Sequence, residues 1–174
     1  MAMRMLDAAG VPIVSDGART ADDSNPRGYY EYERVKELDK GLDTSWLEDA
    51  RGKAIKIISF LLRDLPETNN YRVIFMQRNM AELIASQNTM LAARGEVPDS
   101  TGDERIAARY QEHLSDVRRL LERQPCFAVL DVDYGAVVEK PLHQAERIAR
   151  FLGGSFDAAK MAAGVDAALY RNRA

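Results

Sequence analysis

The sequence is poor in the residues that build many metal, disulfide and catalytic sites. It has one cysteine, Cys126, so no disulfide can form within the chain, and its two histidines, His113 and His143, are far apart and accompanied by no cysteine cluster. Zinc sites and histidine-based catalytic sites need several such side chains together. We therefore expect no metal centre and no histidine-based catalysis. The single cysteine also fits a reducing compartment.

Long apolar runs and a dominant charge are missing as well. No run of about 18 apolar residues occurs, so we expect no membrane span. Asp7 interrupts the short apolar stretch at the N-terminus, which therefore does not have the pattern of a signal peptide. The net charge of −3 gives no general attraction to nucleic acid or to a membrane surface. A cytoplasmic protein is expected, and any phosphate site in it must be local.

The composition is typical of one globular domain with a core. Apolar residues make up 46% and charged residues 29% of the 174 positions. There is no internal repeat, low-complexity segment or linker that would separate two domains. We predict a single domain over residues 1–174.

The stretch from Tyr71 to Ser86 is the most informative part of the sequence. Val73–Met76 predicts a strand that is buried on both faces, and from Asn79 the apolar spacing becomes helical, with Glu82 placed to complete a capping box. Arg78 falls in the turn at the carboxyl end of the strand, where α/β sheets bind ligands. Next to a helix N-terminus it is a candidate phosphate-binding residue. The alternative is an ordinary solvated surface charge.

Strands and helices alternate along the rest of the chain. Helices are predicted over 1–9, 44–50 and 141–152, from Thr101 to just before Pro125, and in a short segment carrying Val35 and Leu38; strands are predicted over 11–14, 53–59 and 127–132. Asp133-Tyr134-Gly135 is expected to be a turn. This order predicts an α/β fold with a parallel sheet covered by helices on both faces.

Lys56 interrupts the apolar strand predicted from Lys53 to Ser59. A lysine inside a buried strand is costly unless its amine reaches water, an anion or a carboxylate. The residue is therefore either a functional cation or one at a sheet edge whose amine reaches solvent along its aliphatic chain.

Three segments together resemble the sulfotransferase family, in particular its bacterial members. The first is the strand, turn and helix with Arg78 and Ser86 eight residues apart. The second is Val-Leu-Asp-Val-Asp-Tyr134 followed by a helix that ends in Phe-Leu-Gly-Gly154. The third is Asp23-Ser-Asn-Pro-Arg-Gly-Tyr-Tyr-Glu31, similar to a stretch found after the first helix of bacterial and protein-tyrosine sulfotransferases. They occur in the family's order and span most of the chain.

The resemblance implies that the co-substrate is 3′-phosphoadenosine 5′-phosphosulfate, with no metal. Arg78 and Ser86 would then hold its 3′-phosphate, and Tyr134 would lie near the adenine, although a buried tyrosine at a strand end is the alternative. Arg27, in the Asn-Pro-Arg-Gly turn, would contact the donor or the acceptor, or remain an exposed turn residue.

The same resemblance points to two candidate catalytic residues. Lys56 matches a strand lysine that some members direct at the transferred group. Two positions later those members have a histidine base, whereas this sequence has Ile58. Glu31 is then the best remaining candidate for the base, with a capping or salt-bridge role as the alternative. The acceptor would be a small molecule or peptide with a hydroxyl or amine.

The sequence departs from the family at its start. Members open with a strand and a glycine-containing loop that holds the 5′-phosphosulfate, whereas this sequence begins in the helix that follows them. The implied fold is a three-layer αβα, P-loop-nucleotide-hydrolase-like sheet whose first central strand and loop are absent. We expect either a shortened polypeptide with impaired catalysis or a remodelled, dimerising fold. The alternatives are a non-catalytic scaffold and another nucleotide-dependent transferase, such as a small kinase.

Overall fold

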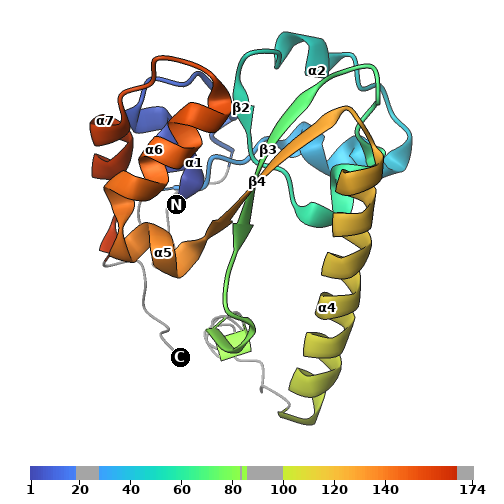
Figure 1. Ribbon diagram of the computed structural model, residues 1–174. Helices are drawn as coiled ribbons and strands as arrows, with labels where there is room; N and C mark the ends of the chain where they lie inside the picture. The colour runs from blue at the N-terminus through green and yellow to red at the C-terminus, as the bar shows by residue number, and fades with distance from the viewer. Residues whose placement is uncertain (19–27, 83, 86–99, 168–174) are drawn as a thin grey trace.

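A computed structural model of the chain describes residues 1–18, 28–82, 84–85 and 100–167 (Figure 1). The helices are α1 (Ala2–Ala8), η1 (Glu33–Lys40), α2 (Trp46–Asp49), η2 (Ser59–Asp64), α4 (Ser100–Arg123), α5 (Tyr134–Glu139), α6 (Pro141–Leu152) and α7 (Ala158–Ala163), of which η1 and η2 are 3₁₀ helices; the strands are β1 (Ile13–Val14), β2 (Ala54–Ile55), β3 (Tyr71–Gln77) and β4 (Phe127–Asp133). The alternation of strands and helices expected from the sequence is present.

The strands pair in parallel, as predicted, but in two separate pairs. β1 pairs with β2, and β3 pairs with β4 over seven residues, from Tyr71 opposite Phe127 to Gln77 opposite Asp133. The sequence predicted one continuous sheet and a longer β2. The paired part of β2 ends at Ile55, because the chain leaves the ladder after it and begins the 3₁₀ helix η2 at Ser59. Ile58, expected in the buried strand, is exposed.

Helices lie on both sides of β3 and β4 (Figure 1). Successive side chains of a strand point to opposite faces, and those of β3 enter two different apolar clusters. Val73 and Phe75 pack into one cluster with residues of η1, α2, η2 and α4, whereas Ile74 and Met76 pack into the other with residues of α1, α5, α6 and α7. The apolar run therefore contributes to both cores, as predicted, although its residues other than Phe75 are only partly buried.

The helix α6 has the bounds that its sequence indicates. Pro141 stands at its first position, where a proline fits the helix, and Gly153 ends it in the left-handed conformation with φ 71°. The side chain of Arg72, from β3, donates to the carbonyl of Phe151 and so binds one of the last carbonyls of this helix. Ile148 is completely buried. The second core is thus centred on α6.

The expected turn at Asp133-Tyr134-Gly135 is instead the start of α5. The Asp133 carboxylate accepts a hydrogen bond from the backbone N–H of Ala136 at 2.8 Å, which makes Asp133 the N-cap of the helix. Aspartate and glycine favour turns and helix starts alike, so the local sequence does not distinguish the two. As a result, Tyr134 follows β4 directly and its position is set by the strand.

Candidate functional site

Arg78 and Tyr134 lie side by side where β3 and β4 end. Because Gln77 is opposite Asp133 in the parallel ladder, the next residue of each chain segment emerges at the same edge. The guanidinium carbon of Arg78 is 5.3 Å from the centroid of the Tyr134 ring. The structure thus brings together two residues that the sequence placed at strand ends 56 positions apart in the numbering.

Glu82 also contacts the Arg78 side chain. The Nε of Arg78 donates to the Glu82 Oε2 at 3.2 Å, and the Glu82 side chain is only 6% exposed. The sequence indicated a capping role for Glu82, and the Asn79 side chain does cap this segment by accepting from the N–H of Ala81. The ion pair between Glu82, in the helical segment, and Arg78, in the turn before it, was not predicted.

The Tyr134 hydroxyl is in a partly desolvated and charged environment. Burial, which disfavours the phenolate, raises its pKa above the ordinary value. The positive charge of Arg78 opposes this shift, and the carboxylates of Glu82 and Asp166 add to it. Tyr134 is therefore neutral at physiological pH and presents an aromatic ring and a hydroxyl beside the Arg78 cation.

Lys56 and Glu31, the two candidate catalytic residues, form an ion pair. The Nζ of Lys56 is 3.1 Å from the Oε1 of Glu31 and 5.9 Å from the centroid of the Tyr29 ring. The Lys56 side chain is 41% exposed. Lys56 lies just after β2, and its amine reaches both solvent and a carboxylate, so it is not a lysine buried inside a strand as the sequence predicted. The contact also agrees with the salt-bridge role considered for Glu31. This role and that of a catalytic base are compatible.

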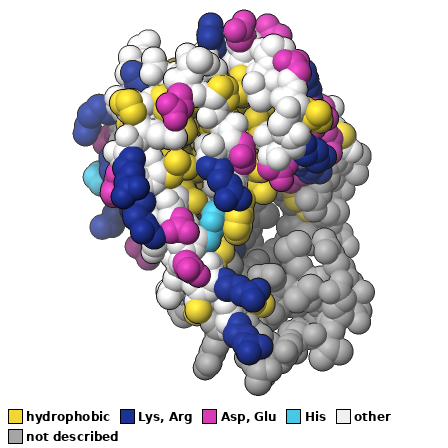
Figure 2. All heavy atoms as spheres, turned by 90° about the vertical axis from the view of Figure 1, so that its right-hand side faces the viewer, with side chains coloured by type: hydrophobic (Ala, Val, Ile, Leu, Met, Phe, Trp, Pro, Cys, Tyr) yellow, Lys and Arg dark blue, Asp and Glu magenta, His cyan; other side chains and the backbone are white. Residues whose placement is uncertain are grey.

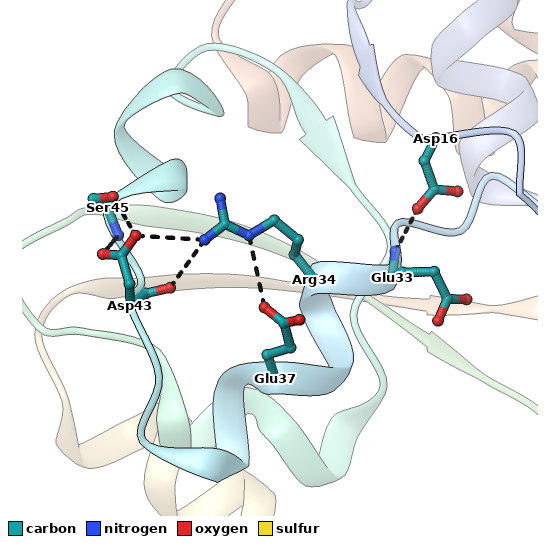
Figure 3. A network of polar contacts seen from close by, with 6 residues as sticks. All are labelled: Asp16, Glu33, Arg34, Glu37, Asp43 and Ser45. Atoms are coloured by element: carbon teal, nitrogen blue, oxygen red, sulfur yellow. Dashed lines mark hydrogen bonds and ion pairs between the residues drawn. The ribbon is translucent and has the colours of Figure 1, made fainter.

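The segment that carries Glu31 is held in place by Asp16. The backbone N–H of Asp16 donates to the carbonyl of Glu31 at 3.2 Å, and its carboxylate accepts from the N–H of Glu33 at 2.6 Å, at the start of η1 (Figure 3). This hydrogen bond from Glu33 is the main reason why the pKa of Asp16 is lowered. The loop after β1 therefore fixes the backbone beside Lys56.

A second set of polar contacts holds the next turns of the same region. Arg34 of η1 pairs with Glu37 and with Asp43, and Asp43 in turn accepts hydrogen bonds from the backbone and the hydroxyl of Ser45, just before α2 (Figure 3). The two ends of the η1–α2 connection are thereby tied together. Surface ion pairs of this kind contribute little stability each, so their main effect is on the conformation of the connection.

Arg4 of α1 forms an ion pair that the sequence did not predict. After burial, the charges of Arg4 and Asp166 act in opposite directions on the pKa of the Tyr134 hydroxyl, Arg4 lowering it and Asp166 raising it. Arg4 itself lies 3.6 Å from Asp166. The sequence signal was the arginine in the first helix, which also contains Asp7.

His113 belongs to a different cluster. Its Nε2 is 2.8 Å from the hydroxyl of Ser59, and its ring stacks on Phe60 with centroids 3.6 Å apart. Burial lowers the pKa of His113, and the nearby charge of Arg63 lowers it further. These contacts join η2 to α4.

The remaining sequence expectations concern two further binding residues, a metal site, a membrane span and the surface charge. Ser86 and Arg27 lie outside the described residues. Within the described ranges no group of three or more His, Cys, Asp or Glu side chains is arranged to hold a metal ion. No helix in the described part of the chain is long and apolar enough to cross a membrane. On the face shown in Figure 2, basic and acidic side chains are interspersed, so its described residues form no extended patch of one sign.

Comparison with known proteins gives one family match. The model of the family described as "Sulfotransferase family" matches residues 20–158, which include β2, β3, β4 and all the candidate site residues. No curated protein and no solved structure matches the chain significantly.

Proposed function

Because the chain belongs to the sulfotransferase family, we propose that it binds 3′-phosphoadenosine 5′-phosphosulfate at the ends of β3 and β4 and transfers the sulfuryl group to a hydroxyl or amine. The observation that carries this proposal is the geometry of Arg78. Its side chain leaves the carboxyl end of β3 with Glu82 on its Nε and the Tyr134 ring beside it. A guanidinium oriented in this way suits bidentate binding of a phosphate.

Arg78 would bind the 3′-phosphate of the donor, together with Ser86, and Tyr134 would contact the adenine. The contact with Glu82 uses only Nε, so it does not engage the two terminal nitrogens of Arg78. The positive charge at this site is local, as a chain with a net charge of −3 requires.

Lys56 and Glu31 would serve the chemical step. The acceptor oxygen or nitrogen attacks the sulfur, the bond from sulfur to the phosphate oxygen breaks, and adenosine 3′,5′-bisphosphate leaves with the electron pair. The Glu31 carboxylate would take the acceptor proton, while the Lys56 cation would stabilise negative charge on the transferred group. The 3.1 Å distance between the two side chains supports this combination of acid–base and electrostatic roles.

The fold proposed for the described residues is the three-layer αβα, P-loop-nucleotide-hydrolase-like arrangement of a single domain. Support comes from β3, whose alternate side chains enter two clusters built by different sets of helices. The parallel pairing of β1 with β2 and of β3 with β4 is also of the kind that such folds use.

The test is binding of adenosine 3′,5′-bisphosphate, measured as a thermal shift and by calorimetry. At a hundredfold excess over the dissociation constant, a ligand of the folded state adds about 2.7 kcal/mol, which for a chain of this size raises Tm by roughly 5–11 °C. We expect this shift for the parent and its loss in Arg78→Ala.

Arg119→Ala is the matched control, since it removes the same charge from an exposed position on α4. Its shift should equal that of the parent. Equal shifts for Arg78→Ala and the parent would refute the donor site at Arg78. A shift with ATP alone would point to a kinase, and no shift with either nucleotide would favour a scaffold.

A further inference from the structure

Glu82 is an unusual residue for its position. Apart from Gln144, it is the only polar residue in the described part of the chain that is buried. A buried carboxylate is costly unless an opposite charge or hydrogen-bond donors compensate it. Arg78, four residues earlier, supplies that charge at 3.2 Å. Salt bridges of this type are not an efficient source of stability. Stability alone therefore does not explain why a carboxylate is buried here.

The geometry of the pair suggests what the carboxylate does. A guanidinium is planar and has one Nε donor and two terminal nitrogens. Glu82 accepts from Nε, and the Tyr134 ring lies 5.3 Å from the guanidinium carbon. One contact therefore limits rotation about the end of the side chain and the other supports its face. Together they set the direction in which the terminal nitrogens point.

We propose that Glu82 is a positioning residue that holds the Arg78 guanidinium in the orientation that receives the phosphate of the nucleotide. This inference rests on the proposed function of Arg78. Glu82 acts only through Arg78 and does not itself touch the ligand. Its negative charge opposes a bound phosphate, so its benefit must come from orientation: a side chain already held in its bound geometry loses less rotational entropy on binding.

The decisive variants are Glu82→Gln and Glu82→Met. Both keep roughly the volume of the buried side chain, but only glutamine retains an oxygen that can accept from the Arg78 Nε. We expect Glu82→Gln to bind adenosine 3′,5′-bisphosphate nearly as well as the parent and Glu82→Met to bind it up to about tenfold more weakly, because the freed Arg78 side chain must then be ordered on binding. A merely structural role would not give this difference in affinity between two folded variants.

A double-mutant cycle tests whether the effect passes through Arg78. In an Arg78→Ala background, Glu82→Met should produce no further loss of affinity. If the parent binds and Arg78→Ala does not, but Glu82→Met binds like the parent or tighter, the positioning role is refuted while the phosphate site stands. If the parent itself fails to bind, the proposed function has failed first.

A measurement on the parent protein covers the case in which Glu82→Met does not fold. In nitrogen-15 NMR spectra without nucleotide, the Nε–H of Arg78, assigned by its loss in Arg78→Lys, should exchange with water much more slowly than that of Arg119, whose side chain is 63% exposed. Equal exchange rates for the two arginines would show that the guanidinium is not held before binding, and would overturn the proposal.

Discussion

Gly164 packs closely against the backbone of α1, and an added methyl group there should destabilise the fold. Gly164 follows α7 and lies against α1. A Cβ at this position would be 2.7 Å from the carbonyl oxygen of Arg4 and 3.0 Å from the Cα of Met5. These are backbone atoms, so they cannot rotate away as a side chain could. In Gly164→Ala, α1 and α7 must therefore move apart.

The expected loss of stability in Gly164→Ala is the difference between the cost of the close contact and the gain from a less flexible unfolded chain. Adding a methylene to a well-packed contact typically destabilises by about 1–3 kcal/mol. Gly164 has φ −69° and ψ −13°, which alanine adopts without strain, so the reduced freedom of the unfolded chain returns about 0.4–1 kcal/mol. We expect a net loss of about 1–2 kcal/mol, which lowers Tm by roughly 2–8 °C.

The assay is urea and thermal unfolding followed by circular dichroism. Ala163→Ser is the control, because Ala163 is the exposed neighbour of Gly164 in the same turn and the added atom would enter solvent; its stability should stay within about 0.5 kcal/mol of the parent. The packing argument fails if Gly164→Ala is as stable as the parent or more stable.

Two further predictions concern the cores and the pH dependence. Ile148→Ala should lower the free energy of unfolding by about 2–5 kcal/mol and Ile148→Val by about 0.5–1.5 kcal/mol, because Ile148 is completely buried; similar urea midpoints for both would contradict this. For His113, burial lowers the pKa in the folded state below the unfolded value of 6.5, so the unfolded chain binds more protons below about pH 6.5. The free energy of unfolding should therefore fall as the pH decreases below that value, and it should fall less in His113→Gln. Parallel pH profiles of stability for the two proteins would rule out this contribution.

The limits of β3 and α6 illustrate what local sequence can decide. Four consecutive apolar residues marked the strand, and Pro141 and Gly153 marked the helix ends; the structure places both elements where these signals are. Such signals work because strand and helix periodicity, and the backbone conformations of proline and glycine, depend on neighbouring residues only. The same reasoning fails at Asp133, which is equally suited to a turn and to an N-cap.

The sequence alone determined the parallel α/β class, the position of Arg78 at a strand end and the likeness to sulfotransferases that the family match confirms. The tertiary structure decided the partners of these residues: Glu82 and Tyr134 for Arg78, and Glu31 for Lys56. It also decided that β2 ends at Ile55. The physical reason is that ion pairs and ring contacts between distant segments depend on how the strands align and the helices pack, which no local pattern encodes.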